Sequence, residues 1–266
     1  MAAGGLPDEG ELRLGPVTLP AGRRIYAGRG PGVPVAWVTR EAVADAGRVW
    51  AVLSGLRPGT GLVPFLLGGL PSDPARPWDT GEFSLPADPA GADDLDAEQV
   101  LAQMWDGQMP TGEPGDEDDE DWQAMRAPFS RQFPGLAPPE HTLLSPQQLT
   151  QALGGLPAAR IGLVPAARTA DVLPLIGWTP SDQSDALPVA AVVRSWEDRF
   201  GARLLRVGFA EISLLASRPP RSISHAQRIA AEHFVFCDEC AGRGLHDVRR
   251  ITASLMESPA WTFWWD

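Results

Sequence analysis

Four side chains of types that bind metals lie close together near the carboxyl end of this 266-residue chain. His233, Cys237, Cys240 and His246 have the spacing His-x3-Cys-x2-Cys-x5-His. Thiolates and imidazoles at such spacing suit a tetrahedral zinc ion. The alternative is that Cys237 packs as a small apolar side chain and Cys240 is incidental. We favour the alternative, because every ligand would come from one short segment, and we predict no metal or other cofactor.

The same two cysteines bear on redox chemistry. They are the only two in the chain, which excludes a disulfide framework and fits a reducing compartment. A redox-active Cys-x-x-Cys normally has its first cysteine at a helix amino terminus, where the dipole lowers the thiol pKa. Cys237 instead follows a predicted helix, so we do not expect redox activity.

Acid–base chemistry has three candidates, His225, Glu232 and His233. Neighbouring residues of a helix point about 100° apart, so Glu232 and His233 cannot both reach one substrate atom. His225 and Glu232 are two turns apart and share a face. The alternative, which we favour, is an amphipathic helix that carries polar side chains.

An anion site is indicated where two arginines precede a helix start. Arg218 and Arg221 flank Pro219-Pro220, and Ser222 or Ser224 can cap the helix that follows. Helix amino termini with arginine nearby bind phosphate or carboxylate groups. The alternative is that these arginines only shield a strand end.

The elements that position these residues form a regular series. Apolar periodicity predicts a helix over 189–200, with Gly201 as its left-handed cap, and further helices over 225–236 and 247–256. Short apolar or alternating runs predict strands over 160–165, in 202–217 and over 261–265. In the last strand Trp261, Phe263 and Trp265 share one side. With a short helix over 170–178, residues 145–266 are predicted to form a β-α-α-β-β-α-α-β domain.

The rest of the chain divides at two changes in composition. The pattern of residues 1–70 predicts a β-β-α-β subdomain, with a helix over 41–56 that ends near Gly55. Residues 71–144 predict an acidic, loop-rich and partly disordered insertion, with one helix capped by Asp93 or Asp94. Together these patterns predict an α+β fold, a mixed sheet with helices packed on it around a shared core.

Charge and hydropathy exclude several classes of protein. All 22 basic residues are arginine, which excludes lysine Schiff-base and P-loop chemistry. The net charge of −12 comes from the insertion, where 15 acids and no base lie between Arg76 and Arg126, so we predict no nucleic-acid partner. The tract 112–121 is either a solvated loop, which we favour, or an arm that docks on a basic partner. No apolar run is long enough for a membrane span and no signal peptide is evident, so we predict a cytoplasmic protein.

Several motifs resemble those of a known family. SWEDRFGA, RPP, AAEHFVFC and the terminal WTFWWD, in that order, resemble the bacterial domain of unknown function 4253 family. The segments GLVP-x-LL at 61–67 and RIGLVPAARTADVLPLIGW at 160–178 are also similar to it. The resemblance implies no activity, cofactor or catalytic residue. It marks as family-motif residues Trp196, Glu197, Arg199, Gly201, Pro219, Glu232, His233, Cys237, Trp261, Trp264, Trp265 and Asp266.

Two hypotheses about function follow. The preferred one is a binding or interaction module that recognises a protein or small-molecule ligand, with an immunity-type role as one version, because packing aromatics outnumber convergent catalytic groups. The alternative is an enzyme with a polar cleft near Arg218, His225, Glu232 and His233. A structure distinguishes them, because an enzyme requires these four side chains to meet around one pocket.

Overall fold

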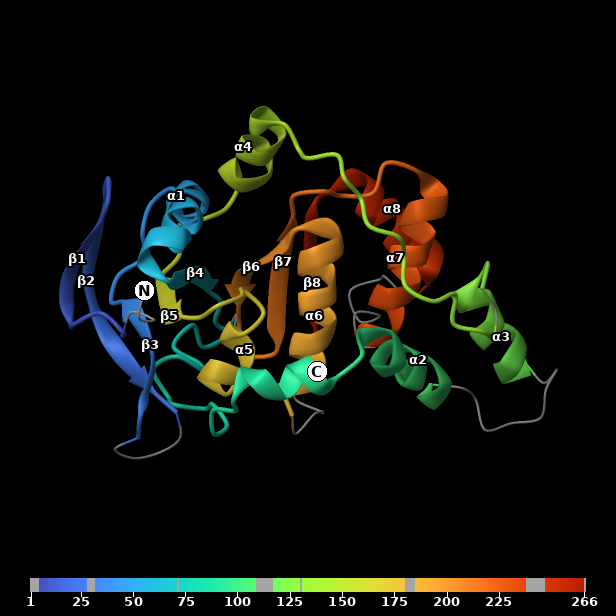
Figure 1. Ribbon diagram of the computed structural model, residues 1–266, viewed down its shortest axis with the longest axis horizontal. Helices are drawn as coiled ribbons and strands as arrows, with labels where there is room; N and C mark the ends of the chain where they lie inside the picture. The colour runs from blue at the N-terminus through green and yellow to red at the C-terminus, as the bar shows by residue number, and fades with distance from the viewer. Residues whose placement is uncertain are drawn as a thin grey trace.

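The computed structural model describes residues 5–27, 32–70, 72–108, 117–129, 131–179, 185–237 and 247–265. Within these ranges, eight strands form one mixed sheet in the order β1-β2-β3-β5-β4-β6-β7-β8 (Figure 1). This architecture confirms the predicted α+β class. The strands are β1 (Gly10–Leu14), β2 (Val17–Tyr26), β3 (Pro34–Thr39), β4 (Leu62–Leu67), β5 (Ile161–Pro165), β6 (Ala202–Val207), β7 (Glu211–Ala216) and β8 (Ala260–Trp264).

Helices lie on both faces of the sheet. On one face α1 packs on β2 and β4 and is joined by α4, while α5 and α6 pack on the other face beside α2 and α7. Figure 1 shows α6 lying over the end of the sheet that contains β7 and β8. The helices are α1 (Ala46–Thr60), the 3-10 helix η1 (Pro89–Asp94), α2 (Ala97–Gly107), α3 (Glu117–Arg126), α4 (Pro146–Gly154), α5 (Val172–Ile176), α6 (Leu187–Phe200), α7 (Ile223–Phe236) and α8 (Val248–Glu257).

One sheet combines the strands before the insertion, β1 to β4, with those after it, β5 to β8. Strand β5 pairs antiparallel with both β3 and β4, and β4 pairs parallel with β6. The other neighbouring strands are antiparallel. The amino-terminal unit has one strand more than the predicted β-β-α-β, because residues 10–26 form a hairpin and 34–39 add a third strand before α1. The carboxy-terminal order from β5 to β8 agrees with the prediction.

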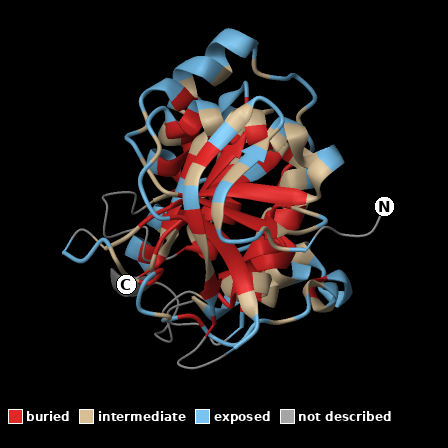
Figure 2. Ribbon diagram, turned by 90° about the vertical axis from the view of Figure 1, so that its left-hand side faces the viewer, coloured by how far each residue is buried: buried red, intermediate tan, exposed pale blue. Residues whose placement is uncertain are grey.

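The core has two parts, one on each face of the sheet. Strand β4 is buried along its whole length, with Val63 and Phe65 facing one apolar cluster and Leu62 and Leu66 facing the other. Figure 2 shows the buried strands enclosed by elements whose outer surfaces are exposed. A strand buried on both faces is apolar at successive positions, which explains the continuous run of apolar residues in β4.

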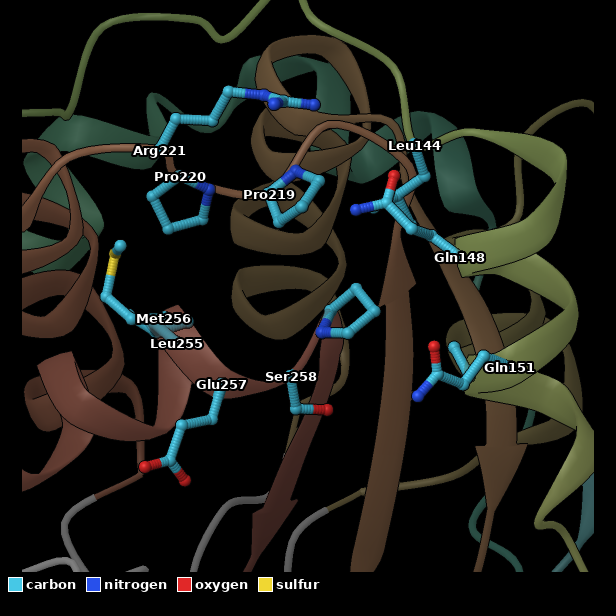
Figure 3. A pocket seen from close by; sticks show the side chains of 12 residues that line it. Leu144, Gln148, Gln151, Pro219, Pro220, Arg221, Leu255, Met256, Glu257 and Ser258 are labelled. Carbon is cyan, nitrogen blue, oxygen red and sulfur yellow. The ribbon is translucent and has the colours of Figure 1, made fainter.

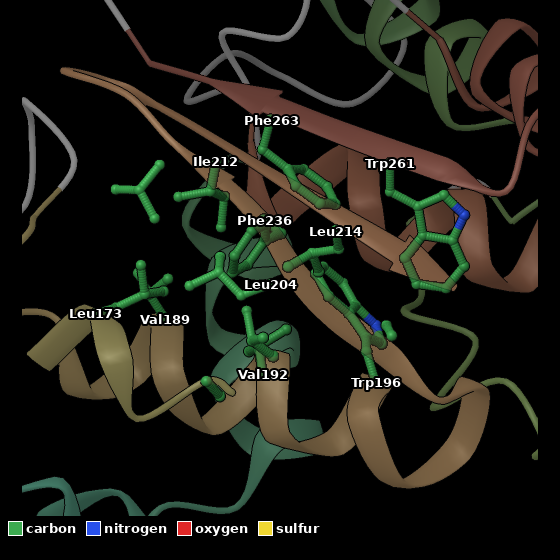
Figure 4. Packing of buried hydrophobic residues seen from close by; sticks show 14 of the residues in the cluster. Leu173, Val189, Val192, Trp196, Leu204, Ile212, Leu214, Phe236, Trp261 and Phe263 are labelled. Carbon is green, nitrogen blue, oxygen red and sulfur yellow. The ribbon is translucent and has the colours of Figure 1, made fainter. Parts of the chain in front are cut away.

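The larger part of the core lies between α6 and strands β6 to β8 (Figure 4). Trp196 of α6 stacks on Phe263 of β8, with ring centroids 5.2 Å apart and planes 12° from parallel. Trp261, Phe263 and Trp265 are buried while Thr262 is exposed, which confirms the predicted alternation of this strand. Most family-motif aromatics therefore serve packing.

Residues 72–144 contain regular structure as well as loops. Helix α2 is capped by Asp96, which accepts hydrogen bonds from the N–H groups of Glu98 and Gln99, and not by Asp93 or Asp94 as predicted. The guanidinium of Arg126 in α3 lies over the rings of Trp105 and Trp122, at 4.3 and 3.6 Å. These contacts join α2 to α3, and the same buried guanidinium lies 5.4 Å from the ring of Phe234 in α7, which anchors the insertion to the body. In the acidic tract, residues 112–116 lie outside the described residues and 117–121 begin α3.

Candidate functional site

An extended segment, residues 131–144, is held against α7 and α6 by polar side chains. We call it the strap, and Figure 1 shows it running past α7 between α3 and α4. Arg228 donates to the carbonyl oxygen of Pro134 at 2.7 Å, and the His225 ring nitrogen Nε2 lies 2.8 Å from that of Pro138. These two residues of α7 therefore hold a loop, and neither lines one of the pockets described below.

Glu232 is the centre of this arrangement. Its carboxylate is fully buried and forms a two-pronged ion pair with Arg199 of α6, at 2.8 and 2.6 Å. It also accepts hydrogen bonds from the indole N–H of Trp196 and the backbone N–H of Ala137, both at 2.7 Å. Four donors occupy both oxygens, so Glu232 joins two helices and the strap and has no accessible lone pair for catalysis.

His233 is enclosed by aromatic rings. The ring centroids of Trp196, Trp261 and Phe263 lie 4.8, 4.7 and 4.8 Å from its own. Burial, and secondly the positive charge of Arg199, lowers the pKa of His233 from 6.5 to about 3. The imidazole is therefore neutral near pH 7 and is a packing group, shielded from any substrate.

The candidate acid–base residues thus do not converge. His225 faces Pro138 of the strap, Glu232 faces Arg199, and His233 faces the aromatic core. Arg218 lies elsewhere, at the end of β7. The described structure places no two of these four side chains at one pocket.

Of the four proposed metal ligands, the structure describes only His233 and Cys237. Cys240 and His246 lie outside the described residues, as does Asp266 of the family motif. Cys237 is disulfide-bonded, which corrects the expectation of a reduced thiol, and its sulfur accepts the backbone N–H of Trp264 at 3.3 Å. A sulfur in a disulfide is not a thiolate ligand. Among the described residues, no three His, Cys, Asp or Glu side chains are grouped to hold a metal ion.

The serines and Arg221 lie at the start of α7. Ser222 caps that helix by accepting the N–H of His225, and its hydroxyl lies 3.4 Å from that of Ser224. Arg221 donates to the strap carbonyl of Leu143 and lines a hollow of about 410 Å³ between α4 and α8. Figure 3 shows Pro219, Pro220 and Met256 at this hollow, with Gln148 and Gln151 on the facing helix. Arg218 is not part of it, so the structure separates the two arginines that the sequence grouped.

Arg218 instead lines a pocket with three other arginines. We call it the arginine pocket; its volume is about 520 Å³ and it lies where β6 begins and β7 ends. The segments that meet there include the end of α1, the loop after β5 and the end of α6. Its lining residues are Arg57, Leu143, Arg168, Glu197, Asp198, Gly201, Arg203, Ser217 and Arg218.

Arg168 fixes one wall of this pocket. It donates to Glu197 at 3.2 Å and to Asp198 at 2.5 Å, and Glu197 also accepts from the N–H and hydroxyl of Thr169. Burial lowers the pKa of Arg168, but the hydrogen bonds that Asp198 and Glu197 accept from it, together with their negative charges, outweigh burial, so the pKa is raised overall. Arg168 remains a cation and pairs with both carboxylates of the pocket, so these three side chains together carry one net negative charge.

Among the described residues, two of the remaining three arginines donate to backbone oxygens and none of the three to a carboxylate. Arg57 donates to the carbonyl oxygen of Ala167 at 3.1 Å and Arg218 to that of Asp198 at 2.8 Å. The Nε of Arg218 is buried with no hydrogen-bond partner, and Arg203 is exposed. In the described part of the chain, none of the three is paired with a carboxylate. The pocket therefore has an excess of positive charge in a chain whose net charge is −12.

Sequence reasoning identified Arg218 but missed Arg57, Arg168 and Arg203. The only signal was indirect, because three motifs of the resemblance meet here: Glu197 and Gly201 from SWEDRFGA, Arg168 from the 160–178 segment, and Arg218 just before Pro-Pro. Gly201 has φ of 59°, the left-handed conformation that ends α6 and turns the chain into β6.

Comparison with known proteins gives a family and no activity. No curated protein and no solved structure shows significant similarity to this chain. The family described as "Domain of unknown function (DUF4253)" matches residues 160–266, which run from β5 to the end of the chain. The segment 61–67 lies outside the match, although its strand β4 pairs with β5. Residues 160–266 are thus similar to the DUF4253 family by the match to its model.

Proposed function

We propose that this protein is a binding module whose arginine pocket recognises a ligand with several negative charges, such as one carrying phosphate or carboxylate groups. The observation that carries the proposal is that three arginines around one hollow of about 520 Å³ have no carboxylate partner among the residues that the structure describes. Guanidinium groups bind phosphate and carboxylate oxygens in a two-pronged geometry, and such charge-assisted hydrogen bonds are stronger than neutral ones.

Two features support binding over catalysis. The polar motif residues of α7 are engaged by the strap and the core, so no nucleophile or base faces the arginine pocket from that helix. The two carboxylates that do line it, Glu197 and Asp198, are held by Arg168. No observation favours the alternative enzyme with His225, Glu232 and His233 as its catalytic groups.

Ligand-induced stabilisation tests the proposal, since a ligand that binds only the folded state raises the melting temperature. Inorganic pyrophosphate and citrate serve as probes of the two anion types. We expect at least one to raise the Tm of the wild type, and the Arg203→Ala/Arg218→Ala double variant to lose the shift. Arg13→Ala, an exposed arginine on β1, is the matched control and should keep it. No shift in the wild type, or an equal shift in the double variant, would contradict the proposal.

Location is part of the same proposal. No described helix combines the length and the apolar character that crossing a bilayer requires. We infer a cytoplasmic protein from the sequence, and fractionation of cells that express it, with antibody detection, is the test. Recovery in a secreted fraction would contradict this inference.

A further inference from the structure

A second hollow, on a different part of the sheet, is larger than the arginine pocket. Its volume is about 780 Å³, and its floor is formed by the face of β4, β6, β7 and β8 opposite α6. Helix α1 packs on β2 and β4 over the neighbouring part of that face, and α4 packs against α1. Residues 68–70, Pro74 and residues 156–160 form its sides. We call this hollow the sheet groove.

Most of the groove surface is apolar. Leu66 and Leu205 lie in its floor, and Leu70, Pro74 and Leu156 line its sides. The floor also carries two hydroxyls, which lie 3.1 Å apart on paired residues of β7 and β8, Ser213 and Thr262. Because these hydroxyls satisfy each other, an apolar group placed over them leaves no new unpaired polar atom.

One charged side chain in the groove lacks a partner. The Nε atom of Arg206 is buried with no hydrogen-bond partner, and no ion pair of this guanidinium occurs among the described residues. The other arginine there, Arg160, is paired with Asp79 at 2.9 Å, and Glu211 is also engaged. Gly68 gives Arg206 its space, since a Cβ at that position would lie 2.8 Å from the Arg206 Nε.

We propose that the sheet groove binds a small carboxylic acid with an apolar body, whose carboxylate pairs with Arg206. The volume lies within the range of about 300–1,000 Å³ that is typical of small-molecule sites, which are mainly apolar with a few polar groups that fix orientation. Arg206 supplies that group, and the leucines and prolines bury the body. This site is independent of the arginine pocket, because the two share no lining residue.

Competition between matched ligands tests the proposal. A fluorescent fatty acid, 11-(dansylamino)undecanoate, is the probe, and decanoate and decanol are the competitors. We expect saturable binding to the wild type, and displacement by decanoate at a concentration at least tenfold lower than by decanol, since a charge-assisted hydrogen bond is worth about 1.5–3 kcal/mol. No saturable binding, or equal potency of acid and alcohol, would overturn the proposal.

Three variants assign the site. Arg206→Met keeps the stem and should abolish the preference for the acid over the alcohol. Thr262→Trp and Leu156→Trp, at exposed and half-buried positions, should fill the groove and weaken both competitors at least tenfold. Circular dichroism and thermal melts establish that each variant is folded, and Arg13→Ala, at an exposed position outside both pockets, should bind the probe as the wild type does. Unchanged binding in both folded tryptophan variants would place the probe elsewhere and refute the proposal.

Discussion

At the scale of single residues, Glu232 is a buried carboxylate with four hydrogen-bond donors around it. Removing one member of such a pair leaves an uncompensated charge, which costs more than the pair itself contributes. Glu232→Gln keeps the shape but leaves Arg199, whose side chain is 12% exposed, without its counter-charge. We expect the free energy of unfolding to fall by about 3–5 kcal/mol.

Urea denaturation measures that loss, and Glu11→Gln is the matched control. Glu11 is exposed on β1, so its change should stay within about 0.5 kcal/mol. A loss below about 1 kcal/mol for Glu232→Gln would show that the carboxylate does not join the strap to the two helices.

His233 gives the fold a pH dependence with a defined sign. Its pKa is lowered to about 3 in the folded protein, so below pH 6.5 the unfolded chain binds a proton that the folded chain does not. Stability from this residue is complete above pH 6.5 and is lost on acidification, by at most about 1.4 kcal/mol per pH unit. The backbone hydrogen bond from Thr142 lowers the pKa of Glu140. This residue therefore changes the pH dependence of stability only close to pH 4.5 and below.

The window from pH 6.5 to 4.5 therefore isolates His233 from Glu140. We expect His233→Phe to flatten the stability profile in that window when unfolding is measured with urea at each pH. His141→Phe changes an exposed histidine and should keep the wild-type slope. A slope that persists in His233→Phe would assign it to another group.

At the scale of elements, the turn from α6 into β6 is set by one glycine. Gly201 has φ of 59°, and a Cβ there would lie 2.2 Å from the hydroxyl oxygen of Ser217. A left-handed conformation costs a residue other than glycine about 1–2 kcal/mol, and the contact with Ser217 adds to it. Gly201→Ala should lower stability by at least that amount and weaken anion binding, because the glycine lines the arginine pocket.

Gly154→Ala is the comparison for this prediction. Gly154 lies in α4, and a Cβ added there meets nothing within 4 Å. Because alanine favours helices, this change should be neutral or stabilise by up to about 1 kcal/mol. Equal thermal stability of the two variants would mean that the Gly201 turn is not under steric constraint.

The elements that the sequence predicts well are those with local signals. Ser222 caps α7, as predicted from serine before a helical run, and Ser145 caps α4 with a full capping box. Helix α1 was predicted to end near Gly55 but continues to Thr60, with Pro58 in its last turn and Gly61 as the left-handed cap. Gly55 tolerates helical geometry, so a glycine alone did not locate the end. Gly61 differs from Gly55 in its backbone conformation, since its φ of 69° is left-handed and that of Gly55 is not.

At the scale of the whole molecule, sequence reasoning fails where distant segments meet. Arg57, Arg168, Arg203 and Arg218 come from four separate segments, and a guanidinium leaves no periodic pattern that reports its neighbours. Their convergence depends on the strand order, in which β4 pairs with β5 and β6 although the 71–144 insertion separates β4 from both in the sequence. For the polar residues of α7, sequence reasoning made the opposite error and predicted a candidate site where the structure has none. They resembled a site locally, but the strap, which the sequence shows only as a loop, occupies them.

The central claim is that the arginine pocket binds multiply charged anions, and calorimetric titration with pyrophosphate tests it most directly. We predict saturable one-to-one binding to the wild type at 50 mM salt and weaker binding at 200 mM, because salt screens charges that solvent can reach. We predict at least tenfold weaker binding to Arg203→Ala/Arg218→Ala. Arg13→Ala should bind as the wild type does. An absence of saturable heat with the wild type, or the same affinity in the double variant, would contradict the account.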